Sequence, residues 1–167
     1  LGFLIATNWT TNDRSEDRFA ATHGRMLLGS LAPEAVMFVY GDAETGPLGY
    51  LNRVEGVRPD VTLISLQGLV YGNRLFPPRA PKRVKQAEVL RFIEATSRPV
   101  YYTVDEDLLP HGRGVRHFGF VKRIEPQGSS TELQLTLNTD SMDYFMELHA
   151  LSSSPDRWMR FRQNKLL

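Results

Sequence analysis

With 167 residues, of which 41% are hydrophobic, the chain can bury the core of one globular domain. The formal net charge of +1 excludes a general attraction to nucleic acids or acidic partners, so any electrostatic argument must be local. The absence of cysteine excludes disulfides, thiolate catalysis and cysteine-ligated metals, but it leaves the cellular compartment open. We expect one domain over residues 1–167, with a core from 13 to 137 and C-terminal helices over 140–167.

The N-terminal stretch Leu1–Ala6 is apolar, but it is far shorter than the roughly 20 residues that a membrane-spanning helix needs. It predicts a first strand, and the alternative is the end of a membrane segment. A helix follows, with Asp13 or Ser15 as its cap and an end near Pro33. Its apolar positions recur at helical spacing: Phe19, Met26, Leu27 and Leu31.

Residues 35–66 have the pattern of a strand, a helix and a second strand. The apolar run Val36–Tyr40 predicts a strand covered on both faces, and Val61–Leu66 is a second such run. Between them, Pro47 suits the first position of a helix that Gly56 closes. The predicted buried stripe of this helix is Leu48, Leu51 and Val54. The unit predicts two parallel strands with a right-handed crossover.

The later elements alternate between helices and strands. A proline-rich loop over 68–81 precedes a helix over 82–96, and residues 100–104 predict a third strand. Residues 109–117 predict a loop. Phe118–Ile124 predicts a strand, and the strict alternation over Thr131–Leu137 predicts its antiparallel partner at an edge of the sheet. Helices are predicted over 142–151 and from Pro155 onward. The inner residues of the helix over 82–96 are expected to be Val89, Phe92, Ile93 and Thr96.

These elements predict an α/β domain of the three-layer, Rossmann-like sandwich type, with a mainly parallel sheet and an antiparallel edge hairpin. Ligands of such sheets bind beyond the carboxyl ends of the strands. The polar side chains expected at that edge form the first candidate binding site: Asp42, Glu44, Thr45, Tyr50, Asp105 and Asp107.

The carboxylates of this first candidate site allow two interpretations. Grouped at one sheet edge, they can hold a divalent cation through oxygen ligands, or act as acid and base. Alternatively, Asp42 and Glu44 only stabilise the start of the helix that opens near Pro47, because free N–H groups and the helix dipole favour acidic side chains there.

The second candidate is a basic surface formed by the stretch 74–91, whose one acidic residue is Glu88. The predicted members of this surface are Arg74, Arg79, Lys82, Arg83 and Lys85. Such a cluster can face anionic lipid headgroups or a phosphorylated glycolipid, or it can be a solvated helix face. The stretch lacks the interleaved aromatic residues of a stacking platform, so we expect no nucleic-acid partner.

Several standard site motifs are missing from the sequence. The four histidines show no zincin spacing, and neither a P-loop, a GxGxxG turn nor a GxSxG elbow is present. We therefore expect no metal site built on histidine and no standard nucleotide site. No cofactor is evident, although a divalent cation at the acidic loops stays an alternative. Arg58 and Asp60 are interpreted as a structural pair.

The block GDAETGPLGYLNRVEGVRPDVTLISL resembles a segment of large bacterial membrane proteins related to protein O-mannosyltransferases and type C glycosyltransferases. That family typically reads GDNDTFPLWYLQ, followed by VEGVRPDV and a strand. Three further elements, NWTTNDRS, RPVYYT and GFVKRIEP, extend the resemblance over most of residues 8–126. The resemblance implies a domain that follows transmembrane helices and lies on the extracytoplasmic, periplasmic side of the cell membrane.

The chain also departs from the family pattern. Gly46 and Gly49 replace two aromatic residues, on which sugars commonly stack, and Ala43 replaces one amide position. In type C glycosyltransferases the catalytic carboxylates lie in loops between membrane helices, so the resemblance implies that this fragment does not transfer sugar by itself.

We therefore expect an accessory domain of a membrane-embedded, glycosyltransferase-like protein. Its expected partners are the remainder of that chain and a glycan, glycolipid or protein acceptor. The alternative is a stand-alone α/β enzyme that uses the acidic loops, with Mg²⁺, on a phosphorylated or glycosyl substrate.

Overall fold

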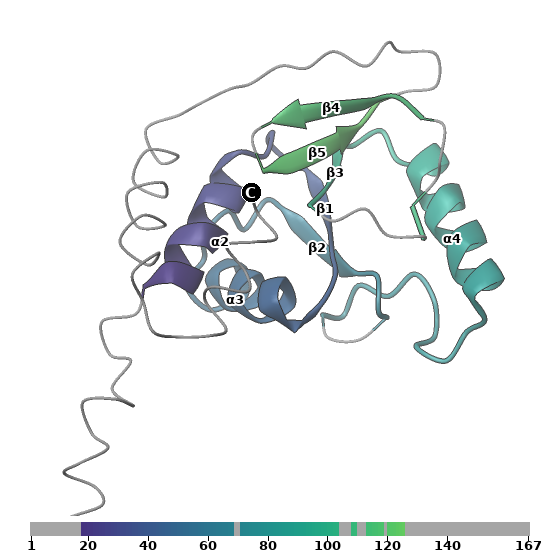
Figure 1. Cartoon of the computed structure of the whole chain (residues 1–167), viewed down its shortest axis with the longest axis horizontal. Coiled ribbons are helices and arrows are strands. Elements are labelled where there is room, and N and C mark those ends of the chain that lie inside the picture. Colours follow the sequence, from purple (N-terminus) through teal and green to yellow (C-terminus); the bar gives the residue numbers. More distant parts are fainter. Residues whose placement is uncertain (1–17, 69–70, 104–107, 110–112, 119, 126–167) are drawn as a thin grey trace, which may run out of the picture.

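The computed structural model describes residues 18–68, 71–103, 108–109, 113–118 and 120–125. In these ranges three helices lie against a five-stranded sheet, as Figure 1 shows. The helices are α2 (Phe19–Gly29), α3 (Asp42–Arg53) and α4 (Lys82–Ala95). The strands are β1 (Val36–Val39), β2 (Thr62–Ser65), β3 (Val100–Tyr102), β4 (Val115–Phe118) and β5 (Val121–Ile124).

The sheet has the strand order β2-β1-β3-β5-β4. Strand β1 pairs in parallel with both β2 and β3, whereas β5 is antiparallel to both β3 and β4. Four of the five strands therefore run in one direction, and β5 runs against them. The predicted mixed α/β fold with a mostly parallel sheet is confirmed, while its assignment to the three-layer, Rossmann-like class stays a prediction.

Two hydrophobic clusters contain alternate residues of the strands. Met37 and its register partner Tyr101 belong to the cluster that holds α2 and α3. Phe38 and Tyr102, one residue further along each strand, belong to the cluster that holds α4. Because successive side chains of a strand point to opposite faces, these clusters cover opposite faces of the sheet.

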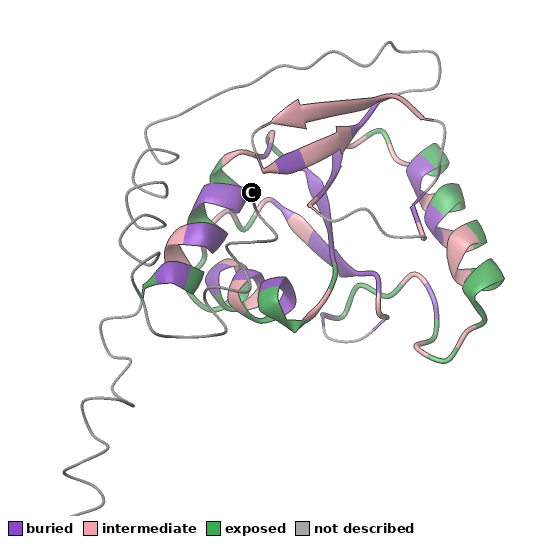
Figure 2. Ribbon diagram, in the orientation of Figure 1, coloured by how far each residue is buried: buried purple, intermediate pink, exposed green. Residues whose placement is uncertain are grey.

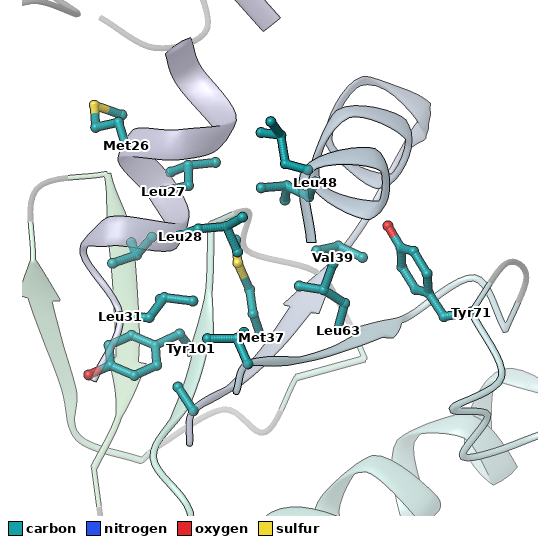
Figure 3. Packing of buried hydrophobic residues seen from close by; sticks show 14 of the residues in the cluster. Met26, Leu27, Leu28, Leu31, Met37, Val39, Leu48, Leu63, Tyr71 and Tyr101 are labelled. Carbon is teal, nitrogen blue, oxygen red and sulfur yellow. The ribbon is translucent and has the colours of Figure 1, made fainter. Parts of the chain in front are cut away.

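Leucines and a methionine of α2 form much of the first cluster. Met26, Leu27 and Leu28 of α2 share this cluster with the sheet residues Met37 and Leu63, and Figure 3 shows Leu28 next to Met37. The predicted inner positions of this helix, Phe19, Met26, Leu27 and Leu31, are all buried. On the other face, Val89 and Ile93 of α4 are buried as predicted.

The predicted start of α3 at Pro47 was wrong, because the helix begins five residues earlier. Gly41 turns the chain directly after β1, with φ 79° and ψ 154°, and its carbonyl accepts the first helical bond from the Thr45 N–H at 3.0 Å. Pro47 lies inside the helix, where its missing N–H removes one backbone bond. The helix also ends earlier, so Val54, predicted to be buried, is 69% exposed.

The prediction of one strand over Phe118–Ile124 was also wrong. Strand β4 ends at Phe118 and β5 begins at Val121, and the two strands form a hairpin in which Phe118 pairs with Val121. Residues 115–117, predicted as loop, belong to β4. A two-residue connection that starts with glycine is a common signal for such a tight hairpin. An antiparallel hairpin does form the edge of the sheet, but from other residues than predicted.

Some predictions concern residues outside the described ranges. These are the strand at Leu1–Ala6, the helix caps Asp13 and Ser15, the strand Thr131–Leu137 and the helices over 140–167. Across the part of the chain that is described, no helix is long and apolar enough to cross a bilayer.

Candidate functional site

The candidate site lies at the edge of the sheet where β1, β2 and β3 end. The chain runs from β1 through α3 to β2, and then returns through α4 to β3 on the other side of β1. The order of connection therefore reverses between β1 and β3. This reversal is the topological switch point, beside which open α/β sheets commonly bind their ligands.

Glu44 connects the ends of β1 and β3. It lies in the first turn of α3 and is 9% exposed. The hydroxyl of Thr103, which directly follows β3, donates to this carboxylate and lies 2.7 Å from both of its oxygens. The dipole at the start of α3 also favours a negative charge there. The carboxylate is thus held in place at the switch point.

The other predicted acidic-site residues do not gather around Glu44 in the described structure. Asp42 and Tyr50 are exposed, and Asp42 stands two positions from Glu44 on the helix, so the two carboxylates lie on different faces of α3. Asp105 and Asp107 fall outside the described ranges. Among the residues that are described, no three His, Cys, Asp or Glu side chains are close enough to hold a metal ion.

The interpretation of Asp42 and Glu44 as charges at a helix start agrees with their position. Both lie in the first turn of α3, but the N-cap residue is Gly41, which offers no side-chain cap. Thr45 is buried, and its hydroxyl has no hydrogen-bond partner among the described residues.

Tyr71 packs against α3 and was not predicted from the sequence. Its hydroxyl donates to the carbonyl oxygen of Thr45, and burial raises its pKa to about 12. A Cβ atom at Gly49 would lie 2.6 Å from the Tyr71 ring, so the glycine makes room for this aromatic side chain. The guanidinium of Arg53 lies 5.2 Å from the centre of the same ring. The sequence did contain one signal of this contact, the glycine at position 49. A glycine inside a helix costs roughly 1 kcal/mol relative to alanine, so its presence indicates that a neighbouring group needs the space.

A cavity of about 360 Å³ opens at the carboxyl ends of β1 and β2, next to the start of α4. We call it the carboxyl-edge cavity. Its lining residues are Tyr40, Leu66, Gln67, Ala80, Lys82, Lys85 and Leu108. Tyr40 immediately follows β1 and is 37% exposed, so its ring is available to a ligand. The two lysines are the charged members of this lining, which therefore favours an uncharged or anionic group.

The predicted basic surface lies around the start of α4 and in the loop before it. Arg74, Arg79, Lys82 and Arg83 are exposed, as predicted. Lys85 is half-buried, with its ammonium 5.3 Å from the centre of the Phe76 ring. The cation–π contact fixes this lysine at the wall of the cavity.

At the opposite, amino edge of the sheet, a cavity of about 500 Å³ is lined by several charged residues. Its charges have partners within the fold. Arg113 pairs with Glu94 at 3.0 Å, and the buried Glu125 lies 3.2 Å from Arg116 and 3.7 Å from Arg123. This network is best explained as a support for the β4–β5 hairpin.

The contacts of Arg58 agree with its interpretation as a structural residue. Its guanidinium pairs with Asp60 at 2.8 Å and donates to the carbonyl oxygens of Leu28, Leu31 and Ala32 at 2.8–2.9 Å. The side-chain bonds hold the pKa of Asp60 well below its ordinary range and raise that of Arg58. Arg58 thereby ties the end of α2 to the segment that enters β2.

Two comparisons with known proteins identify relatives of this chain. A family model described as TMEM260-associated domain 2 matches residues 20–71. The chain is also 28% identical, over 112 residues, to the protein O-mannosyl-transferase TMEM260 of Mus musculus. Both matches relate this chain to a TMEM260-associated domain. The aligned part covers 67% of this chain but 14% of that relative, and no solved structure matches.

The comparisons support the predicted relation to a protein O-mannosyltransferase. The family match over residues 20–71 includes β1, α3 and β2, and therefore the block that carried the sequence resemblance. The bacterial origin and the relation to type C glycosyltransferases stay predictions.

Proposed function

We propose that this chain is an accessory domain of a membrane-embedded, glycosyltransferase-like protein and binds an acceptor or partner at the carboxyl edge of its sheet. The observation that carries the proposal is the match to a protein O-mannosyl-transferase. The aligned part makes up 14% of the length of that relative. A segment of this size is suited to recognition next to a catalytic membrane region. We also propose that the domain is of the three-layer, Rossmann-like type and lies on the extracytoplasmic side of the membrane.

Two features of the carboxyl edge support a binding role. Glu44 and Thr103 hold the ends of β1 and β3 together, which gives this edge a fixed shape. The carboxyl-edge cavity beside it offers an exposed tyrosine ring, an amide and apolar side chains. Such a combination suits a glycan or a glycosylated acceptor, because aromatic faces pack on sugars and amides bond their hydroxyl groups.

The proposal predicts where sugar transfer takes place. Cells that express the full-length gene product are expected to incorporate labelled mannose into protein, whereas the isolated 167-residue chain transfers none. A full-length protein that lacks residues 18–125 should keep its fold in the membrane and lose efficient acceptor use. Transfer by the isolated chain would overturn the accessory role.

The divalent-cation alternative has its own test. If Mg²⁺ bound the acidic loops, millimolar Mg²⁺ would raise the melting temperature of the chain, since any ligand of the native state stabilises it. We expect the same melting temperature in Mg²⁺ and in EDTA, because Asp42 and Glu44 lie on different faces of α3. A rise with Mg²⁺ would favour the stand-alone enzyme instead.

A further inference from the structure

The charge of this chain is distributed unevenly. Residues 74–91, which we call the basic segment, contain six basic residues and one acidic residue, whereas the chain as a whole has a formal net charge of +1. The basic segment therefore carries +5 and the remaining residues carry −4. A separation of this size produces a local positive field that the overall charge conceals.

Lys82 and Lys85 of the basic segment line the carboxyl-edge cavity, whereas its arginines are exposed. Helix α4 buries Val89 and Ile93 against the sheet, while Arg83, Leu90 and Arg91 are exposed on its other faces. Figure 2 shows exposed residues along the side of α4 turned away from the strands. The arginines of this segment are thus available to a large surface, not only to a small ligand.

Apolar side chains accompany these charges. Val84 and Leu90 of α4 are 44% and 37% exposed, so two of the five large hydrophobic residues exposed in the described structure lie on this one helix. Glu88, the one acidic residue of the basic segment, pairs with Arg91. Basic side chains around exposed aliphatic ones are typical of helices that lie at a membrane interface.

We propose that the basic segment docks onto an anionic lipid surface, with α4 parallel to the bilayer. Each lysine or arginine near such a surface contributes about 1 kcal/mol, and several acting together give measurable binding. Val84, which is exposed on the side of α4 opposite the buried Ile93, adds a small apolar contribution at the level of the headgroups. The inference rests on the proposed function, which puts this domain beside a bilayer.

The arrangement favours a lipid surface over a nucleic acid. Exposed aromatic side chains that would stack on bases are absent from the described residues of the basic segment, where Phe76 is buried. The exposed arginines of the segment lie both in the loop before α4 and on α4 itself, so a charged surface can contact them together.

The test uses the 167-residue chain and sedimentation with vesicles. One vesicle preparation contains phosphatidylcholine alone, and the other also contains phosphatidylserine. We expect binding only to the second preparation, and we expect salt to weaken it because exposed charges are screened within about 10 Å at 0.1 M ionic strength. Equal binding to both preparations, or binding to neither, would overturn the proposal.

A pair of charge-reversal variants locates the surface. Arg79→Glu with Arg83→Glu should weaken binding at least about tenfold, since each basic residue contributes about 1 kcal/mol. Arg18→Glu with Arg25→Glu makes the same change in net charge outside the basic segment and should weaken binding less than about threefold. All four residues are exposed, so the variants should fold. An equal loss in both variants would contradict docking through the basic segment.

This experiment separates the two proposals. Vesicle binding requires the basic segment, whereas acceptor use requires the carboxyl-edge cavity, and Arg79 and Arg83 do not line that cavity. Loss of docking with unchanged mannose incorporation would leave the proposed function standing. Vesicle binding that does not increase with phosphatidylserine would reject the lipid surface and leave a protein as the partner of the basic segment.

Discussion

The two edges of the sheet use charged side chains in different ways. At the amino edge, Arg58 and Arg98 each donate to several backbone carbonyl oxygens that surround the starts of the strands. At the carboxyl edge, Tyr40 and the lysines of the basic segment line a cavity or lie exposed. The arginines of the first edge therefore support the fold, whereas the second edge has side chains that can contact a ligand.

This contrast explains why net charge and composition say little about function here. A guanidinium has several N–H donors and can satisfy carbonyl groups that would otherwise be left without a partner. Arg98 donates to the carbonyl oxygens of Glu34 and Ala35, and it also donates to the hydroxyl of Thr62 at 2.9 Å. The arginines of the basic segment are instead exposed. The position of an arginine in the fold therefore decides whether it supports the fold or can contact a partner.

The largest effect is expected from breaking the amino edge. Arg58→Ala would remove the bonds to three carbonyl oxygens and the ion pair with Asp60, so the free energy of unfolding should fall by about 2–4 kcal/mol. Urea unfolding followed by circular dichroism measures this loss. The control is Arg25→Ala, which removes the exposed pair with Glu55 and should cost less than about 1 kcal/mol. Similar losses in both variants would contradict the structural role of Arg58.

The same pair predicts a dependence on pH. The pKa of Asp60 is lowered in the folded protein, so its ionised form adds stability above the unfolded-state pKa, about 4. That stability should disappear as the pH falls from there toward the folded-state pKa. Unfolding midpoints measured across this range should decline more in the wild type than in Arg58→Ala. Parallel declines would show that Arg58 does not hold the Asp60 carboxylate.

A smaller effect is expected at the turn that opens the carboxyl edge. The φ and ψ of Gly41 lie in a region that is essentially restricted to glycine, so Gly41→Ala should destabilise the fold by roughly 1–3 kcal/mol. Gly46 of α3 has open space where a Cβ atom would lie. Gly46→Ala should therefore stabilise the fold by about 0.5–1 kcal/mol. Unfolding midpoints that move in the same direction for both would refute this account of the turn.

A loss of stability similar to that of Gly41→Ala, or smaller, is expected at the contact between the strand ends. Thr103→Val keeps the shape of the side chain but removes the hydroxyl that donates to Glu44, with an expected loss of about 1–2 kcal/mol. Thr103→Ser retains the hydroxyl and should cost less. Chemical denaturation of the two variants gives the comparison, and equal losses would indicate that the bond to Glu44 contributes nothing.

Periodic apolar patterns predicted the buried helices and the parallel strands of the fold. Leu27 and Val89 could be assigned because amphipathic helices have a 3.6-residue period that the sequence displays directly. The start of α3 could not be predicted, because it depends on the positive φ of Gly41, and proline was the stronger local signal. The hairpin was missed because Phe118–Ile124 was interpreted as one continuous strand, whereas β4 ends at Phe118 and β5 begins at Val121.

The sequence predicted where the candidate site lies, but it predicted few of the residues that form it. The rule for parallel sheets pointed to the edge after β1 and β3, and Glu44 does lie there. Thr103 and Tyr71 were not predicted, because contacts 59 and 26 residues apart in the chain leave no local pattern. Tyr40 was counted only as the last residue of a strand, although that position is where a side chain reaches the cavity.

The most direct test of the central claim is the kinetics of mannose transfer by the full-length protein carrying Tyr40→Ala and Gln67→Ala. If the carboxyl-edge cavity binds the acceptor, these changes should raise KM for the acceptor while kcat stays near the wild-type value. Val54→Ala, an exposed position outside the cavity lining, should change neither constant. An unchanged KM in the Tyr40 and Gln67 variant would contradict recognition at this edge.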